Sequence, residues 1–190
     1  MPKIAIDVVL LPPEEIMERA IAINGNLKED PIQLNKRNCL PHISLCMGVV
    51  KEEDLPIVKK LITEIASYHS KLSLTIGRIN REQTTFDIKK TDDLQKLHEH
   101  IMTALSPYLS YDATTRMCYS PPPVVEKTVF WINNYREKSS FANYFPHITL
   151  GISNVTDKKL DIRFTASTLA LCHLGNYCTC RKILHAVHLT

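Results

Sequence analysis

The stretch PHISL at residues 41–45 returns almost unchanged as PHITL at residues 146–150. Successive side chains of a β-strand point to opposite faces, so residues i and i+2 share one face. As a strand, each copy presents its histidine and its hydroxyl on one face and its apolar residues on the other. Core packing selects apolar character and not residue identity, so two such copies indicate a shared functional site.

The four polar residues of these copies are His42, Ser44, His147 and Thr149. The ordinary pKa of histidine, about 6.5, lets one imidazole act as a general base while the other acts as a general acid. The two hydroxyls can donate hydrogen bonds to the non-bridging oxygens of a phosphodiester, whose charge grows in the transition state. We therefore predict that His42 and His147 are catalytic and that Ser44 and Thr149 bind phosphate, with no metal ion and no cofactor.

The two motifs, HISL at residues 42–45 and HITL at residues 147–150, resemble the paired H-x-S/T-x motifs of the 2H phosphoesterase superfamily. This superfamily includes the bacterial 2′-5′ RNA ligase-like proteins and cyclic nucleotide phosphodiesterases. The separation, 147 − 42 = 105 residues, fits one motif in each lobe of the family's bilobal, pseudo-twofold fold. The resemblance implies an α+β protein in which two antiparallel β-sheets face a central cleft, with helices on the outer sides, and residues 1–190 form a single two-lobed domain.

The resemblance further implies a metal-independent phosphodiesterase that acts on a 2′,3′-cyclic phosphate or a 2′-5′ linkage of RNA ends or small nucleotides, with RNA ligation as the reverse reaction. The RNA ligase-like branch often carries an arginine just beyond its second motif, where this chain has GIS at residues 151–153. This departure weakens the assignment to a 2′,3′-cyclic RNA end over another small cyclic or 2′-5′ diester. A second hypothesis is a non-catalytic module that binds a nucleotide or an RNA end in the same cleft.

The composition is that of one compact, enzyme-sized unit of 190 residues, 44% of them apolar. The first residues lack the charged start and apolar run of a leader, and no apolar run reaches the roughly 20 residues that span a membrane. We therefore expect a cytoplasmic monomer without a membrane segment. The net charge of +3 is dispersed, which favours a short RNA end or a small nucleotide as partner over a long duplex. With only five glycines, a glycine-rich phosphate loop is not expected.

Six cysteines in a chain of this length, not arranged as a dense framework, are expected to be reduced thiols. A third hypothesis is a zinc-stabilised interaction protein built on ligands near the carboxy terminus. The Cys-x-Cys spacing there differs from the C-x2-4-C spacing of structural zinc sites, so we predict no metal. The potential ligands are Cys172, His173, Cys178, Cys180, His185 and His188.

Apolar periodicity predicts a succession of strands and helices. Thr91 is expected to cap the third helix, with His98 and His100 on its exposed surface. The segment 110–127 contains three consecutive prolines and is expected to be irregular, either as a connector between lobes or as a loop over the cleft. The predicted strands are 3–11, 42–50, 72–76, 84–88, one beginning at 147 and a closing pair within 167–184, and the predicted helices are 14–24, 52–68, 92–105 and 128–135.

Aromatic residues precede the second motif, where a ring can stack on a nucleobase. Tyr144 is the first candidate for this contact, and the alternative is that it packs the loop that leads into the strand. Trp131, the only tryptophan, has helical neighbours and is expected in the core.

Overall fold

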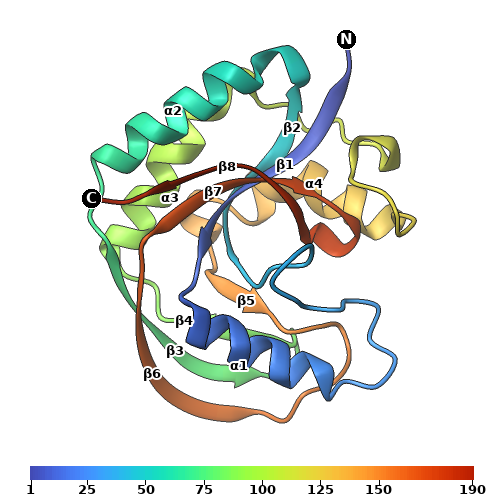
Figure 1. Cartoon of the computed structure of the whole chain (residues 1–190), viewed down its shortest axis with the longest axis vertical. Coiled ribbons are helices and arrows are strands. Elements are labelled where there is room, and N and C mark those ends of the chain that lie inside the picture. Colours follow the sequence, from blue (N-terminus) through green and yellow to red (C-terminus); the bar gives the residue numbers. More distant parts are fainter.

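The computed structural model describes residues 1–190 and shows an α+β protein (Figure 1). Every predicted strand and helix is present, with ends shifted by a few residues. In chain order the elements are β1 (Lys3–Leu11), α1 (Glu14–Gly25), β2 (Ile43–Lys51), α2 (Leu55–Ser67), β3 (Leu72–Asn80), β4 (Thr85–Ile88), α3 (Asp92–Leu105), α4 (Glu126–Lys138), β5 (His147–Thr149), β6 (Lys158–Ala166), β7 (Thr168–Leu174) and β8 (Cys180–His188).

All eight strands belong to one antiparallel sheet, in the order β6-β3-β4-β5-β2-β1-β7-β8. The sheet is curled, with β3 and β6 in the lower left of Figure 1 and β7 and β8 crossing its upper half. It divides into two halves of four strands, and each half ends at a motif strand. The two antiparallel sheets expected from the sequence are thus the halves of one sheet. They are joined because β5 pairs with β2, which leaves neither motif strand as an open edge.

Three helices cover the half formed by β2, β1, β7 and β8. Helices α3 and α4 pack against β2, while α2 packs against β7, β8 and α3. The buried residues of α2, Val58, Ile62 and Ile65, recur at helical spacing, so this helix turns one apolar face inward. Helix α1 lies in front of β3 in Figure 1 and buries Ile16 and Ala20 in the main core. None of the helices combines the length and apolar character needed to cross a membrane.

The start of α3 follows the sequence prediction, but one of its histidines does not. The Thr91 hydroxyl accepts a hydrogen bond from the Leu94 backbone N–H at 3.3 Å, which confirms the cap. The prediction that His98 is exposed is wrong, because the residue is fully buried. Its Nδ1 donates to the carbonyl oxygen of Leu45 at 2.7 Å, and its Nε2 accepts from the backbone N–H of Phe141 at 2.8 Å. With both nitrogens bonded, the imidazole can be buried without an unsatisfied polar group.

The cysteines are not all reduced, contrary to the prediction. Cys172 of β7 and Cys180 of β8 form a disulfide, with Cα atoms 5.5 Å apart. The two cysteines are not register partners, because Cys172 pairs with Ile183 and Cys180 pairs with Leu174. The separation of their Cα atoms nevertheless suits a disulfide, and sequence spacing alone does not reveal it. The disulfide also withdraws two of the ligands on which the zinc hypothesis depends. The free cysteines are Cys39, Cys46, Cys118 and Cys178.

Strand β6 is the strand that the sequence prediction lacks. It pairs only with β3, at the edge of the sheet, and alternates exposed with more buried residues. Its sequence, KKLDIRFTA, is rich in charge, as is common for an edge strand, and this charge obscured the alternation.

The proline-rich segment before α4 is neither the connector between lobes nor the loop over the cleft that the sequence suggested. It joins α3 to α4, which both pack against β2. The backbone N–H of Tyr119 donates to the carbonyl oxygen of Leu174 at 2.6 Å, and Nε2 of His173 bonds to the carbonyl oxygen of Met117 at 3.0 Å. These contacts hold residues 110–125 against β7, and none of these residues lines the cavity described below.

Candidate active site

The two motif strands lie side by side in the middle of the sheet, and their register brings the four predicted polar residues together. The central residues of the motifs, Ile43 and Ile148, are antiparallel partners. Continuing this register by one residue in each direction sets each histidine opposite the hydroxyl of the other motif. Side chains opposite each other have Cβ atoms about 4.5–5.5 Å apart, and these four share the face away from the two isoleucines. The facing pairs are His42 with Thr149 and Ser44 with His147.

Both histidines are oriented by a backbone carbonyl two residues earlier in the chain. Nδ1 of His42 bonds to the carbonyl oxygen of Leu40 at 2.7 Å, and Nδ1 of His147 bonds to that of Phe145 at 2.9 Å. A carbonyl oxygen can only accept, so Nδ1 carries the proton and Nε2 of the neutral ring keeps a free lone pair. Nε2 is therefore the atom of each ring that can take up or release a proton.

A cavity of about 600 Å³ opens over these residues. Its wall includes both histidines, Ser44 and Thr149, together with the hairpin between β3 and β4 and one face of α4. The volume lies within the range of about 300–1,000 Å³ typical of small-molecule sites. The wall contains two basic residues, Lys127 and Lys138, and one acidic residue, Glu82.

Burial shifts the pKa values of both histidines downward. It lowers the pKa of His42 to about 4, against the opposing effect of the Leu40 carbonyl, and the charge of His147 lowers it further. Burial also lowers the pKa of His147, while the Phe145 carbonyl and the charge of Asp87 act in the opposite direction. Both rings are therefore neutral at pH 7 in the empty cavity. A bound phosphate dianion or monoanion would raise both pKa values, because it favours the charged imidazolium.

Asp7 of β1 lies beside the first motif and is absent from the sequence prediction. The Ser44 hydroxyl donates to its Oδ2 at 2.6 Å, and Nε2 of His42 is 3.9 Å from the same oxygen. Asp7 is fully buried, and its Oδ1 has no hydrogen-bond partner. Burial raises the pKa of Asp7 to about 8, although the hydrogen bond from Ser44 lowers it. The sequence signal for this residue is an acid inside the apolar strand KIAIDVVLL, where charged residues are rare.

The second motif has a different carboxylate beside it. Asp87 of β4 is the register partner of His147. It accepts hydrogen bonds from Thr85 at 2.7 Å, from Nε of Arg78 at 2.6 Å and from Asn80 at 3.0 Å. The charge of Asp87 is thus balanced by an arginine, whereas the carboxyl beside the first motif has no cation. The two halves of the site therefore share the motif but differ in the neighbouring carboxyl group, which is paired with an arginine only beside the second motif.

Tyr144 lies in the cavity wall, but its ring is not open to a base. Its exposure is 4%, and its ring stacks on the imidazole of His98. Its hydroxyl donates to the carbonyl oxygen of Ser44 at 3.1 Å. This placement fits the alternative given above, the packing of the loop that leads into the second motif strand.

Other aromatic rings are open to the cavity. Trp131 is not in the core as expected but is half-buried and lines the cavity, because α4 turns this face toward the site. Phe130 of the same helix and Phe145 next to the second motif also line the cavity, and they are 51% and 43% exposed. Phe145 was among the aromatic residues noted before the second motif, behind Tyr144 as the first candidate. Phe130 was not predicted as a site residue, since its exposure to the cavity depends on the tertiary fold.

The segment after the second motif carries no cation. The backbone N–H groups of Ile152 and Ser153 each donate to Oδ2 of Asp30 at 2.7 Å. A Cβ on Gly151 would come within 2.6 Å of the same oxygen, so only glycine fits there. The positions where the RNA ligase-like branch often has an arginine are therefore held against the carboxylate of Asp30 in this chain. The cations of the cavity come from α4 instead.

No protein-family model and no curated protein matches the sequence. Solved structures do match the fold. TT0787 of Thermus thermophilus is 14% identical, with a TM-score of 0.65 over 98% of each chain. LigT of E. coli complexed with NADP+ is 14% identical, with a TM-score of 0.60 over 99% of each chain. A structure described as a phosphoesterase is 15% identical, with a TM-score of 0.59 over 100% of this chain and 99% of that one. The chain therefore has the LigT-like fold over its whole length, which agrees with the resemblance of its motifs to the 2H phosphoesterase superfamily.

Proposed function

We propose that this protein is a phosphodiesterase that uses two histidines, without a metal ion, to cleave a 2′,3′-cyclic phosphate or a 2′-5′ linkage of an RNA end or small nucleotide. The observation that carries the proposal is the pairing of β2 with β5, which sets each histidine opposite the hydroxyl of the other motif on one face. Two proton-transferring groups and two hydrogen-bond donors then surround a space that suits one phosphate.

The two imidazoles divide the proton transfers of hydrolysis. One Nε2 removes a proton from water as the water oxygen bonds to phosphorus. The other ring, protonated at Nε2, donates its proton to the ribose oxygen whose bond to phosphorus breaks. The products are a phosphomonoester and a ribose hydroxyl. With the 5′-hydroxyl of a second RNA as the attacking group in place of water, the same ring opening forms a 2′-5′ phosphodiester as the bond from phosphorus to the 3′ oxygen breaks and that oxygen takes up the proton. The same groups therefore support ligation.

The hydroxyls hold the non-bridging oxygens, whose negative charge grows in the transition state. The Thr149 hydroxyl lines the cavity and is free to donate. Ser44 donates to Asp7 when that carboxyl is ionised. Because the pKa of Asp7 is raised to about 8, the carboxyl is protonated at neutral pH and can donate to Ser44 Oγ instead. The serine proton is then available to the phosphate.

Structures of the same fold support a nucleotide or phosphate as the ligand. E. coli LigT has been solved in complex with 3′-AMP, with phosphate, with NADP+ and with ATP. The cavity of this chain lies over the motif residues and has the volume of a small-molecule site.

The test is incubation of the purified protein, with a chelator present, with a short RNA that ends in a 2′,3′-cyclic phosphate and with a 2′-5′-linked oligonucleotide. We expect a phosphomonoester or cleaved product, identified by mass spectrometry. His42→Ala and His147→Ala should each lower turnover by about 10²–10⁴-fold, the usual contribution of one acid or base. His100→Ala, at an exposed histidine of α3, is the matched control and should retain wild-type turnover.

Other outcomes would redirect the assignment. Tight binding without product would support the non-catalytic module. Turnover that the chelator abolishes, or that survives both histidine substitutions, would contradict the two-histidine mechanism.

A further inference from the structure

Resting on the proposed function, we infer that the face of α4 that lines the cavity binds the single-stranded RNA that precedes the reacting phosphate. The substrate is then an oligoribonucleotide and not a mononucleotide. The juxtaposition that carries the inference is a row of lysines and open aromatic rings on α4, in the same cavity as the two motif histidines.

The row follows one face of the helix. Each member lies three or four residues from at least one other member, so together they occupy one face of α4. It extends over 138 − 127 = 11 residues, or about 16 Å at about 1.5 Å per residue. Thr128 and Ile132 lie on the opposite side and are buried. The row consists of Lys127, Phe130, Trp131, Asn134 and Lys138, all of which line the cavity.

The two lysines have no carboxylate partner in the protein. Neither Lys127 nor Lys138 takes part in an ion pair, and Glu82 is the single acid in the cavity wall. Each ammonium instead lies over a ring, Lys127 Nζ at 5.0 Å from the Trp131 centroid and Lys138 Nζ at 4.6 Å from the Phe130 centroid. A cyclic mononucleotide has one phosphate, which the hydroxyls of Ser44 and Thr149 hold between the two histidines. The lysines therefore match phosphates of further nucleotides.

The aromatic rings match the bases between those phosphates. Phe145 packs against the His147 ring, with centroids 5.9 Å apart and planes inclined by 26°, and so marks the reacting end. Phe130 lies on α4 and leaves 51% of its surface exposed. Large aromatic rings open to a cavity with unpaired cations are typical of platforms on which bases of single strands stack. An RNA strand sets flat bases between charged phosphates, and this row likewise sets its two rings between two lysines.

The first experiment compares two substrates of the wild-type protein, adenosine 2′,3′-cyclic phosphate and a tetraribonucleotide that ends in the same group. We expect kcat/KM to be at least about fivefold higher for the tetranucleotide, the gain from one base stack at the low end of its range. Equal kcat/KM for the two substrates would overturn the inference.

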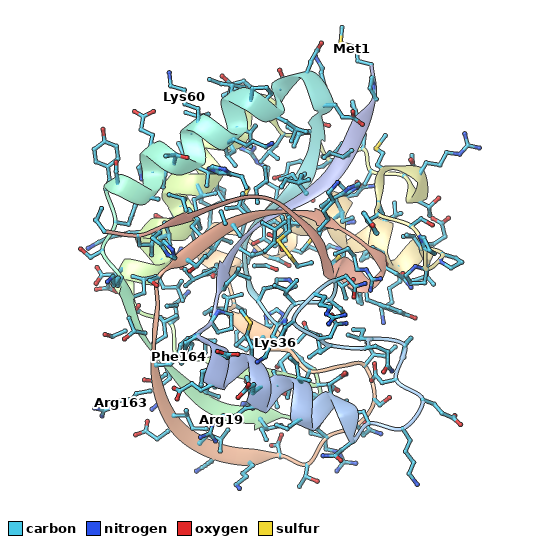
Figure 2. The ribbon with its side chains drawn as sticks, viewed as in Figure 1. Met1, Arg19, Lys36, Lys60, Arg163 and Phe164 are labelled. Atoms are coloured by element: carbon cyan, nitrogen blue, oxygen red, sulfur yellow. A yellow bond between two sulfur atoms is a disulfide. The ribbon has the colours of Figure 1, made fainter.

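The second experiment removes the two cations. Lys127→Ala/Lys138→Ala should lower kcat/KM for the tetranucleotide, mainly through KM, by at least about fivefold more than kcat/KM for the mononucleotide. The dependence of log kcat/KM on log salt concentration should become shallower by about 1.4, from about 0.7 for each cation that contacts a single strand. The charge-matched control is Lys60→Ala/Arg163→Ala, because these residues are absent from the cavity wall and point outward from the body in Figure 2. Equal losses on both substrates, or a loss as large in the control, would contradict the proposal.

The third experiment does not depend on turnover. A fluorescently labelled tetranucleotide with a 3′-phosphate, which the reaction does not consume, is titrated with each variant. Binding should weaken in Lys127→Ala/Lys138→Ala and, by at least about fivefold, in Phe130→Ala, whose fold is checked by circular dichroism. Retained binding in Phe130→Ala would contradict base stacking on this face. If the wild type cleaves neither substrate yet shows this pattern of binding, the phosphodiesterase proposal fails and the RNA-binding face stands.

Discussion

The imidazole of His98 lies flat against the phenol ring of Tyr144, with centroids 3.9 Å apart and planes inclined by 2°. Both rings also bond to the backbone of the first motif strand, the Tyr144 hydroxyl to the carbonyl oxygen of Ser44 and Nδ1 of His98 to that of Leu45. Since Tyr144 is three residues before His147, the pair ties the segment that leads into the second motif to the strand that carries the first. We therefore expect this contact to help fix the spacing of the two motif histidines.

Tyr144→Phe keeps the ring and removes the hydroxyl. The Ser44 carbonyl then loses a partner, and we expect the free energy of unfolding to fall by about 1–3 kcal/mol. Turnover should fall less than tenfold, through kcat more than KM, because the reacting groups remain while their spacing loosens. Thermal unfolding and steady-state kinetics measure both effects. Tyr68→Phe, at a tyrosine that is 70% exposed, is the control and should change neither. An unchanged melting temperature in Tyr144→Phe would show that the contact does not hold the motifs.

Asp7→Asn should flatten the pH dependence of stability. The folded protein holds the Asp7 proton with a pKa of about 8, against an ordinary value of 3.8. The stability from this carboxyl is therefore complete below pH 3.8 and is lost as the pH rises through about 8. The wild type should therefore lose stability relative to Asp7→Asn between about pH 4 and about pH 8, seen as a falling difference between their melting temperatures. The control is Glu64→Gln, at an exposed residue of α2, whose melting temperature should change with pH as that of the wild type does. Parallel curves for the wild type and Asp7→Asn would refute the raised pKa.

The pH profile of kcat/KM reports the histidines of the free enzyme. Activity needs one neutral and one protonated imidazole, and the pKa values of both are lowered from 6.5 by burial, that of His42 to about 4. We expect the maximum of kcat/KM below pH 6.5 and a decline toward neutral pH, measured from about pH 4 to about pH 9. A maximum above pH 7 would mean that the imidazoles are not buried as described.

The number of thiols that react without reduction tests whether a disulfide joins β7 to β8. Four of the six cysteines are free and two form the disulfide between Cys172 and Cys180. Alkylation of the unfolded, unreduced protein should therefore label four thiols, and alkylation after reduction should label six. Cys172→Ser should leave Cys180 as a fifth thiol that reacts without reduction. Labelling of all six thiols without reduction would restore the expectation of a fully reduced chain.

The local parts of this fold could be predicted from the sequence because each depends on neighbours in the chain. Strand alternation gave the shared face of His42 and Ser44, helical spacing gave the buried side of α2, and the Thr91 cap needed only the next turn of α3. The repeated motif predicted that the two motif strands belong to one site. The structure brings all four of its polar residues to one cavity.

The parts that could not be predicted depend on contacts between distant segments. The pairing of β2 with β5 joins residues more than 100 positions apart, and it converts two expected sheets into one. His98 carries a surface-like signature on its helix, and only the approach of Leu45 and Phe141 makes it a buried residue. The acid in β1 was visible in the sequence, but its partner Ser44 was not, because that partner lies on the neighbouring strand.

The central claim is that His42 and His147 act together in one transition state. The most direct measurement is kcat/KM for His42→Ala, His147→Ala and the double variant, on an RNA with a 2′,3′-cyclic end and with chelator present. We expect each single substitution to lower kcat/KM by about 10²–10⁴-fold. The double variant should be little less active than the less active single variant, because the effects of groups that act as a unit are not additive. Losses that multiply in the double variant, or wild-type activity in either single variant, would show that the two histidines do not form one reaction centre.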